Sequence, residues 1–365
     1  MAQHIAFRAD ASTRIGSGHV KRCLSLAEAL MAAGLRASLV TRASDLPLAI
    51  APQAAGVATL VHPWDRDWQA GADAGSVPHA DWLNTDWQTD ADQTVAALRD
   101  RHIDILVIDH YALDSRWHRR VGGALGCAVV VVDDLADRAL AADLIIDHNH
   151  AEDHTSKYAA VNTLSCPILG GPRFAMLTPG FAMAARNPVD DPVRSVGIFM
   201  GGVDLPNLSA SALQGLRQTA GFDGEIEIVT TRGNPHLPTL RALVDRDARA
   251  SLVVDADNLI AFFGRHELHI GAGGGATWER CCLGAPTIAL IAADNQRQVL
   301  LPLAHLDVIA LIETESPDAA MIGQQAIELM HRADLRHALA ANAKQLVDGQ
   351  GCARIAHEFM TLCAR

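Results

Sequence analysis

Basic residues are in the minority in this chain. Thirty Lys and Arg stand against 42 Asp and Glu, a formal net charge of −12, which argues against broad binding to nucleic acids or anionic membranes but not against a small anion site. No stretch reaches the ~18 apolar residues that a transmembrane helix needs. Arg8 and Asp10 interrupt the segment where a signal peptide would be apolar. We therefore predict a cytoplasmic protein with neither a nucleic-acid nor a membrane partner.

Cysteines are few and irregularly spaced. There are seven, an odd number, two of them are adjacent, and their spacing matches no zinc site. This pattern is typical of reduced thiols in a cytosolic core and argues against a disulfide framework. The 365 residues are 49% hydrophobic and 20% charged. Such a chain folds without stabilising disulfides or metal ions, and its length predicts two or three domains.

Apolar runs alternate along the chain with helical patterns. The runs lack period-2 alternation, which is typical of parallel strands buried on both faces. Strand-like runs include 103–108 and 128–132, and helical patterns include 276–283, 319–332 and 334–347. This alternation predicts an α/β protein with doubly wound sheets.

Proline and glycine interrupt this pattern once, near the middle of the chain. We therefore expect two Rossmann-like domains that face each other across a cleft. The predicted parts are an N-terminal domain at 1–165, a connection at 166–192, a C-terminal domain at 193–350 and a helix at 351–365 that could pack on either domain.

A turn with Gly16, Gly18 and His19 follows the first predicted strand and leads into a helix. The glycines allow a ligand to approach the backbone closely, and ligands of open α/β sheets bind where strands end. The helix dipole keeps a histidine in the first turn neutral, and a neutral imidazole is a competent general base. The alternative is a histidine that caps the helix or packs in the core. The turn is not a dinucleotide-binding fingerprint, because Lys21 stands where the third glycine would be.

A second turn is richer in glycine, with four glycines in the five positions 271–275 before a predicted helix. Bare N–H groups and a helix N-terminus form a cradle for phosphate, and Glu279 could accept hydrogen bonds from a ribose diol. The sequence has no Gly-Lys-Ser/Thr, so the turn is not of the Walker type. The alternative is a turn that serves chain geometry alone. A third turn, with Gly201 and Gly202, is either a plain tight turn or a second part of the same site.

The segment 293–296 also follows a strand. Its Asn295 and Gln296 carry donors and acceptors suited to sugar hydroxyls and N-acetyl groups, although Asp294 could simply cap the helix. Asp109, His110 and Tyr111 end another strand. Four of the six tryptophans lie within 62–92, a segment with little regular pattern that we expect to be functional.

These segments together resemble the UDP-2,4-diacetamido-2,4,6-trideoxy-β-L-altropyranose hydrolases of pseudaminic acid biosynthesis. The resemblance covers most of the chain, in order. The matching motifs are RAD at 8–10, IGSGHVKR at 15–22, IDHY at 108–111, ILGGPRF at 168–174, GGVD at 201–204 with Asn207, GAGGGATWER at 271–280 and DNQ at 294–296. The segment 62–92 matches the family least.

The resemblance implies a two-domain glycosyltransferase-B-type (GT-B) fold, related to the enzyme that adds N-acetylglucosamine to the lipid precursor of peptidoglycan. It also implies metal-independent attack of water at the anomeric carbon of a UDP-sugar, with His19 as general base, UDP as leaving group and no cofactor. The alternatives are a UDP-sugar-dependent glycosyltransferase of the same fold and a non-catalytic nucleotide-sugar-binding protein.

Site residues follow from the turns and from this resemblance. For UDP we expect Gly201, Gly202, Gly273, Gly274, Gly275, Thr277 and Glu279. For the sugar we expect Asp10, Gly16, Gly18, Tyr111, Asn295 and Gln296. No metal site is expected, because no convergent carboxylates flank the 271–275 turn.

Overall fold

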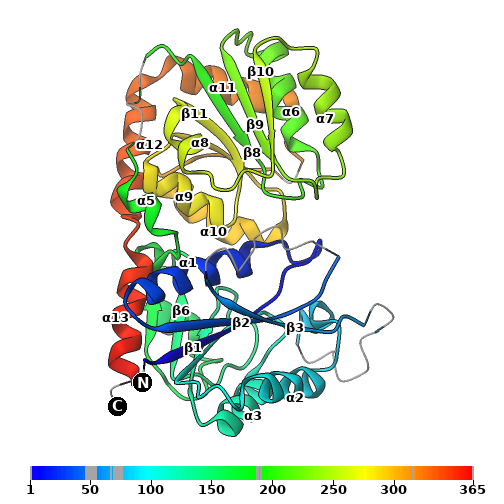
Figure 1. Cartoon of the computed structure of the whole chain (residues 1–365). Helices are drawn as coiled ribbons and strands as arrows, with labels where there is room; N and C mark the ends of the chain where they lie inside the picture. Colours follow the sequence, from blue (N-terminus) through cyan, green and yellow to red (C-terminus); the bar gives the residue numbers. More distant parts are fainter. Residues whose placement is uncertain are drawn as a thin grey trace. The chain divides into compact units, whose positions relative to one another are not determined.

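The computed structural model describes residues 2–45, 56–65, 68, 77–185, 189, 191–314 and 316–363, with the backbone alone at 294 and 295. The chain divides into two compact units (Figure 1). The first unit consists of Met1–Pro179 and Gln350–Arg365, and the second of Gly180–Gly349. The chain thus returns to the first unit for its last helix.

Parallel strands form the sheet of the first unit, in which seven strands are described. Its central strands are buried along nearly their whole length, which explains why their sequences do not alternate. In spatial order the strands are β3 (Ala58–His62), β2 (Arg36–Arg42), β1 (His4–Ala9), β4 (Ile105–Asp109), β5 (Ala128–Val132), β6 (Leu144–Asp147) and β7 (Ile168–Gly170).

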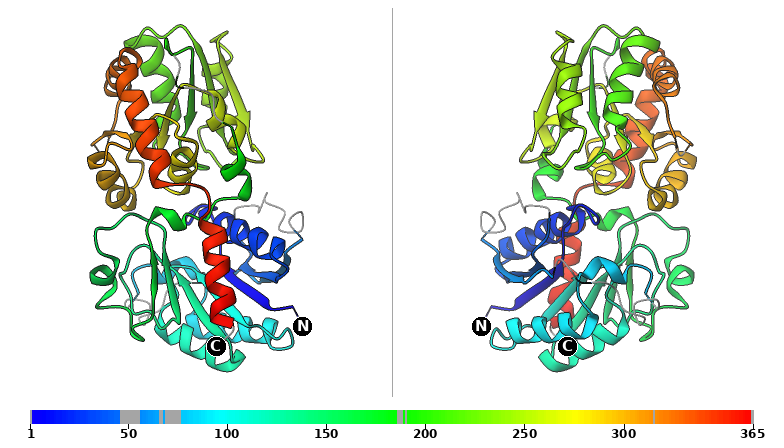
Figure 2. Two further views of the ribbon diagram at one scale, coloured as in Figure 1. Left: turned by 90° about the vertical axis from the view of Figure 1, so that its left-hand side faces the viewer. Right: turned by 90° about the vertical axis from the view of Figure 1, so that its right-hand side faces the viewer.

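Helices cover both faces of this sheet. Leu26 of α1 (Gly18–Ala32) and Phe359 of α13 (Gly351–Cys363) share one apolar cluster with alternate residues of β1 and β4. Trp117 of α3 (Ser115–Leu125) lies in the cluster on the opposite face. Figure 2 shows α13 running alongside the first sheet. The helical segments of this unit are α1 (Gly18–Ala32), η3 (Ala80–Leu83), α2 (Trp87–Leu98), α3 (Ser115–Leu125), α4 (His154–Tyr158), η4 (Pro172–Phe174) and α13 (Gly351–Cys363).

The second unit repeats this plan around a parallel sheet with six described strands. Residues of α6 (Leu208–Gln214), α7 (Leu237–Val244) and α11 (Ala319–His331) share the apolar cluster on one face of this sheet. In spatial order the strands are β10 (Ala250–Val254), β9 (Glu225–Thr230), β8 (Ser195–Phe199), β11 (Leu268–Ala272), β12 (Thr287–Leu290) and β13 (Ala310–Ile312). The helical segments are α5 (Pro179–Met183), α6 (Leu208–Gln214), η5 (Gly215–Thr219), α7 (Leu237–Val244), α8 (Ile260–Arg265), α9 (Gly275–Leu283), α10 (Asp294–His305), α11 (Ala319–His331) and α12 (Ala333–Leu346).

The structure confirms the predicted α/β class with two Rossmann-like sheets. It differs in detail from the sequence-based division, because β7 is the last strand of the first sheet and the first unit continues to Pro179. The last helix, α13, packs on α1 within the first unit. Several elements had no sequence prediction, among them the edge strands β3, β7 and β13 and the helices α3, α4 and α5.

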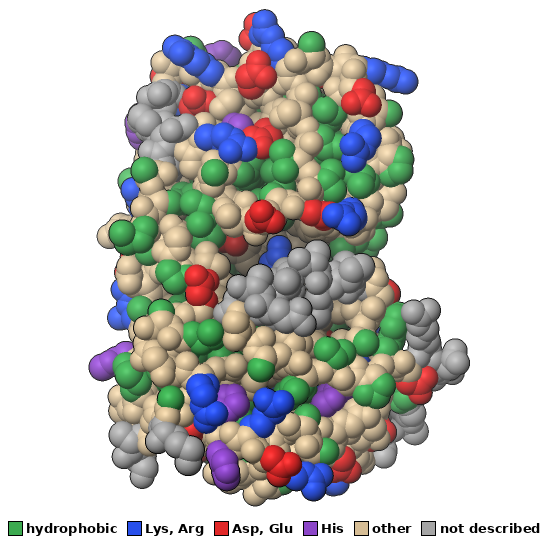
Figure 3. Space-filling view, in the orientation of Figure 1, with side chains coloured by type: hydrophobic (Ala, Val, Ile, Leu, Met, Phe, Trp, Pro, Cys, Tyr) green, Lys and Arg blue, Asp and Glu red, His purple; other side chains and the backbone are tan. Residues whose placement is uncertain are grey.

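The surface carries charged side chains of both signs. Figure 3 shows Lys and Arg side chains interspersed with Asp and Glu on the face that it draws. Within the described part of the chain, no helix has both the length and the apolar character needed to span a membrane.

Candidate active site

Each sheet has one place where the strand order reverses, and loops leaving there diverge and open a ligand position. In the first sheet this place lies between β1 and β4, which pair in parallel with Ala9 opposite Asp109. The chain leaves β1 through the glycine turn and enters α1 at Gly18, so that His19 is the second residue of the helix. This topology brings His19 to the end of β4, although 90 residues separate it from Asp109.

His19 and Asp109 form a buried pair. The distance from His19 Nδ1 to Asp109 Oδ1 is 2.6 Å, and the histidine side chain is 9% exposed. This contact is shorter than the 3.2 Å between Nδ1 and Arg22 Nη2, so we assign the ring proton to Nδ1, which donates to the carboxylate. The lone pair of Nε2 is then left to accept a proton, as a general base requires.

Arg22 keeps Asp109 ionised. Its Nε and Nη2 each lie 2.6 Å from the Asp109 carboxylate. Burial alone would raise the pKa of Asp109, but Arg22 and His19 hold it well below the usual range. A permanently charged carboxylate fixes the imidazole orientation and stabilises the imidazolium that forms when the base takes up a proton.

The ends of β5 and β6 complete this edge of the site. The Tyr111 hydroxyl donates to Asp134 at 2.5 Å, and the Asn149 side-chain amide donates to the same carboxylate at 2.9 Å. Arg22 Nη1 lies 3.2 Å from Nε2 of His148, whose pKa burial and then Arg22 lower to about 3. His148 is therefore neutral and can accept this hydrogen bond.

A group of aromatic rings lies beside His19. The Tyr111 ring meets the His19 ring edge to face, with centroids 4.7 Å apart. His79 and Trp82, both partly exposed, lie 5.7 and 5.8 Å from Tyr111. Both come from the tryptophan-rich segment, whose residues 66–67 and 69–76 fall outside the described part of the chain. Its described end therefore contributes to this site.

Asp10 lies in a buried ionic network beneath the turn. Its carboxylate accepts from Arg8 Nη1 at 2.5 Å and Nη2 at 2.9 Å, and from the Arg42 backbone N–H at 2.6 Å. Arg8 and Arg42 also pair with Asp90, at 2.6 and 2.7 Å. Asp10 is 4% exposed. Its acceptors are thus committed to the protein, which gives it a structural place rather than direct access to a sugar.

The glycines of the first turn have different surroundings. Gly16 has φ of +76°, a conformation that side-chain-bearing residues rarely adopt, and its N–H donates to Ser12 O at 2.7 Å. Gly18 starts α1, and a Cβ there would meet no heavy atom within 4 Å. The turn therefore leaves open space beside the first residue of the helix.

In the second unit the strand order reverses between β8 and β11, which also pair in parallel. The glycine turns at 201–202, after β8, and at 273–275, after β11, therefore leave the same edge of the sheet. After β11, the exposed Gly274 and Gly275 lead into α9, with φ of +101° at Gly274. No side chain caps α9 and no acidic residue lies in its first turn. This N-terminus is suited to bind an anion.

Other predicted residues of this turn point partly inward. Gln296 Oε1 accepts from the backbone N–H groups of Gly273 at 3.1 Å and Ala292 at 3.0 Å, so it joins two loops. Thr277 is fully buried, and its hydroxyl accepts from Arg280 at 3.3 Å. Glu279 is half-buried on α9. The side chain of Asn295 lies outside the described residues.

The turn after β8 differs from the turn after β11 because a carboxylate bonds the N-terminus of the helix that follows it. Gly201 has φ of +86°, and the carbonyl of Gly202 accepts from Thr231 Oγ1 at 2.5 Å. The Asp204 carboxylate then accepts from the N–H groups of Leu208 and Ser209, at 2.8 and 3.0 Å. The N-terminus of α6 is thus satisfied by the chain's own carboxylate.

Sequence reasoning missed several residues of these sites. Asp109 was noted but not linked to His19, and Arg22, Asp134, His79 and Trp82 had no assigned role. The signal for Asp109 was available, since it ends a buried strand and β1 and β4 are central neighbours in this topology. The described residues contain no cluster of three or more His, Cys, Asp or Glu that could hold a metal ion.

Comparisons with known proteins agree with this architecture. No protein-family model matches the chain. The spore coat polysaccharide biosynthesis protein SpsG of Bacillus subtilis (strain 168) is 21% identical over 359 residues, which is 96% of each chain. The UDP-2,4-diacetamido-2,4,6-trideoxy-beta-L-altropyranose hydrolase of Campylobacter jejuni (strain NCTC 11168) is 22% identical over 301 residues, 82% of this chain and 96% of that protein.

Among solved structures, the calicheamicin glycosyltransferase CalG4 superposes with a TM-score of 0.67 and 14% identity, covering 100% of this chain and 99% of that one. Together with the two parallel sheets, this likeness shows a GT-B fold. The chain is thus a GT-B protein with distant similarity to a UDP-sugar hydrolase.

Proposed function

We propose that this protein hydrolyses a UDP-linked sugar to UDP and the free sugar, with His19 as the general base. The observation that carries this proposal is the His19–Asp109 pair, 2.6 Å apart and held by Arg22 at the reversal point of the first sheet. A non-catalytic binding protein has no need for an oriented imidazole with an ionised partner.

The reaction is a substitution at the anomeric carbon. His19 Nε2 removes a proton from water as the water oxygen attacks, and the bond between the anomeric carbon and the β-phosphate oxygen breaks. Negative charge then develops on the leaving UDP. Backbone N–H donors and the N-terminus of α9 stabilise that charge, and Asp109 stabilises the imidazolium.

The substrate that we propose carries a 2,4-diacetamido-2,4,6-trideoxyhexose, as in pseudaminic acid biosynthesis. Two features support this choice: the similarity to the Campylobacter hydrolase, and the group of aromatic rings of Tyr111, His79 and Trp82 beside His19. A sugar with one methyl and two acetamido groups presents more apolar surface than glucose, and aromatic rings bind such surface well.

The binding residues fall into two groups. For UDP, we propose the backbone of Gly273, Gly274 and Gly275 with the turn at Gly201 and Gly202, and Glu279 for the ribose. Thr277 and Asp10 would support their sites from within.

For the sugar, we propose the space beside Gly16 and Gly18, together with Tyr111, Asn295 and the side-chain amide of Gln296. No step needs a metal ion or cofactor.

The decisive experiment incubates the protein with a panel of UDP-sugars in the absence of acceptor and follows UDP release. We expect release from a diacetamido-trideoxyhexose donor, and a loss of roughly 10²–10⁴-fold in His19→Asn, the usual contribution of a general base. UDP affinity of this variant should be unchanged. Glu28→Gln, an exposed change on the same helix, is the matched control and should be fully active.

Two results would overturn the proposal. One is full activity of His19→Asn. The other is UDP release that begins only when a hydroxylated acceptor is added, which would make the protein a glycosyltransferase like its structural neighbour CalG4.

A further inference from the structure

Arg280 differs from the other arginines that are buried in this protein. Arg8, Arg42 and Arg138 each pair with aspartate at 2.5–2.7 Å. Arg280 is 1% exposed, and no ion pair of it occurs among the described residues. Its Nε and Nη1 have no hydrogen-bond partner there either. Its charge is thus buried without a compensating carboxylate, which is costly unless something else compensates it.

The position of Arg280 is a second unusual feature. Its Nη2 donates to the carbonyl of Ala272 at 2.8 Å and to Thr277 Oγ1 at 3.3 Å. These two residues flank the glycine turn that precedes α9. Its Nη1 occupies the space that a Cβ of Gly271 would fill, so the strand end is shaped around the guanidinium.

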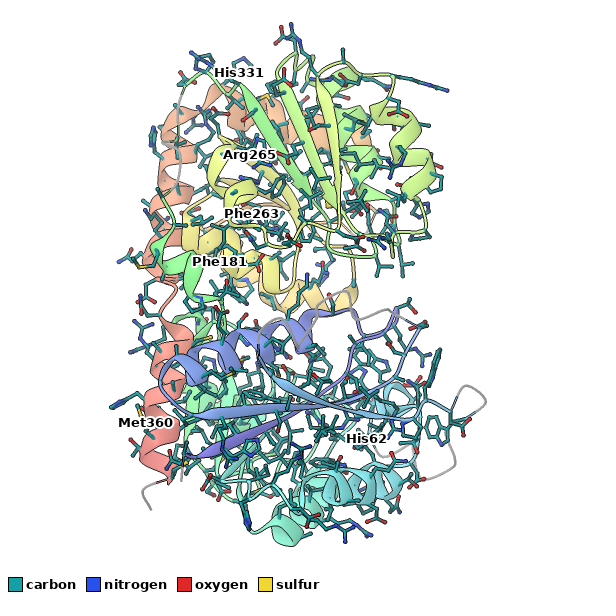
Figure 4. The ribbon with its side chains drawn as sticks, in the orientation of Figure 1. His62, Phe181, Phe263, Arg265, His331 and Met360 are labelled. Carbon is teal, nitrogen blue, oxygen red and sulfur yellow. The ribbon has the colours of Figure 1, made fainter. Side chains whose placement is uncertain are left out.

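Few groups offset the cost of this burial. The guanidinium lies 5.8 Å from the ring centre of Phe263 (labelled in Figure 4), a weak cation–π contact. Burial lowers the pKa of Arg280 to about 10, with smaller opposite contributions from Cys281 and Glu279. The group is nevertheless charged at neutral pH. A buried positive charge therefore lies directly behind a helix N-terminus that has neither a capping side chain nor an acidic residue.

We infer that Arg280 is a positioning residue whose buried charge and hydrogen bonds shape the α9 turn for a diphosphate, the anion that would compensate it. This inference rests on the proposed function for the identity of the anion. It goes further in assigning to an inward-pointing arginine the electrostatic attraction that the exposed glycines cannot provide. Without a ligand, the second unit folds with the Arg280 charge uncompensated. When a diphosphate binds at the α9 turn, its negative charge compensates that of Arg280 and strengthens binding.

The test measures Kd for UDP, inorganic pyrophosphate and uridine by calorimetry, together with melting temperature, in the wild type and in Arg280→Gln, Arg280→Met and Arg280→Lys. We expect the Gln and Met variants to bind UDP and pyrophosphate on the order of 10- to 100-fold more weakly, the effect of one charge several ångströms away in a partly desolvated site. Lys, which keeps the charge, should restore most of the affinity. Any uridine affinity should not change.

Arg336→Gln is the matched control in the same unit. Arg336 is fully buried too, but its Nη1 donates to the carbonyls of Leu329 and Met330 at 2.5 and 2.9 Å, so it caps the end of α11. Its loss should lower the melting temperature and leave the UDP affinity unchanged. Arg280→Met should show the opposite pattern, because replacing an unpaired buried charge with an apolar side chain is often neutral for stability.

The outcomes separate this inference from the proposed function. If wild type binds UDP and the Arg280 variants bind it equally well, the inference is wrong and the UDP site stands. If wild type binds pyrophosphate in an Arg280-dependent manner but not UDP, the UDP-sugar activity fails and the anion site stands. Arg280 variants that cannot fold would also overturn the inference, since it requires that the free unit does not depend on the charge.

Discussion

The two units have the same architecture but place different chemistry at the reversal point of their sheets. In the first unit, side chains that can move or hold protons converge there: His19, Asp109, Arg22, Tyr111 and His148. In the second unit, exposed backbone and an uncapped helix occupy the equivalent place, with Arg280 as the buried charge behind it.

This difference is the basis for proposing a separate role for each unit. Acid–base chemistry needs oriented side chains whose charge is controlled by neighbours, and the first unit supplies them within a network of paired ions. Binding of a phosphate anion needs N–H donors that approach closely, which glycine allows and larger residues hinder. We therefore propose that the first unit carries out the reaction and that the second unit binds the nucleotide.

Acid should affect the first unit far more than the second. Burial, chiefly, lowers the pKa of His62 to about 4 and of His118 and His148 to about 3, and all three lie in the first unit. Below pH 6.5 the unfolded chain takes up protons that the folded unit does not, so stability is lost as the pH falls. Each histidine costs at most about 1.4 kcal/mol per pH unit, or up to about 6 kcal/mol for the three between pH 7 and 5.

Urea unfolding at pH 7 and pH 5 measures this effect. Trp117 is buried in the first unit and Trp278 in the second, so Trp278→Phe restricts the fluorescence to tryptophans of the first unit. His118→Asn should remove the contribution of one histidine to this loss of stability. Equal acid sensitivity of both units would contradict the comparison.

The second prediction tests whether Asp109 acts through His19. Asp109→Asn should slow UDP release roughly 10²–10⁴-fold, as loss of a carboxylate that orients a catalytic imidazole does elsewhere. The affinity for UDP should not change, because we propose that the second unit binds UDP. The double variant with His19→Asn should be no slower than the single variants, because both remove the same function. Losses that multiply would show that Asp109 acts independently of His19.

Local signals in the sequence were sufficient for much of this architecture. Helices α11 and α12 lie within one residue of their predicted bounds at each end, and His19 does start a helix after a glycine turn. Helix α3 had no prediction, because paired glycines in a polar segment do not suggest a helix. One of them, Gly122, is required there, since a Cβ would collide with Val129 of β5.

The functional pairings needed tertiary information. His19 meets Asp109 only because β1 and β4 are neighbours, and no local pattern encodes a contact over 90 residues. Arg280 stands between Glu279 and Cys281 on a predicted helix, where an arginine ordinarily faces solvent. Only the packing of α9 on the sheet turns it inward. Asp10 shows the reverse case, a residue placed in a ligand site by its motif and in a buried network by the fold.

The smallest expected effect concerns the two helix N-termini of the second unit. Asp204, three residues before the N-cap position of α6, accepts hydrogen bonds from the first two N–H groups of the helix, those of Leu208 and Ser209, whereas no side chain caps α9. Asp204→Ala should therefore cost about 0.5–2 kcal/mol of stability, the usual value of an N-cap, and leave UDP affinity unchanged. Asp204→Asn should retain most of the stability, because asparagine caps helices almost as well and tolerates the positive φ of 46° found here. Thermal unfolding and calorimetry with UDP measure both quantities. Tighter UDP binding by Asp204→Ala would show that its carboxylate repels an anion from the Gly201–Gly202 turn. That result would give both turns an equal part in the nucleotide site, and the contrast between them would disappear.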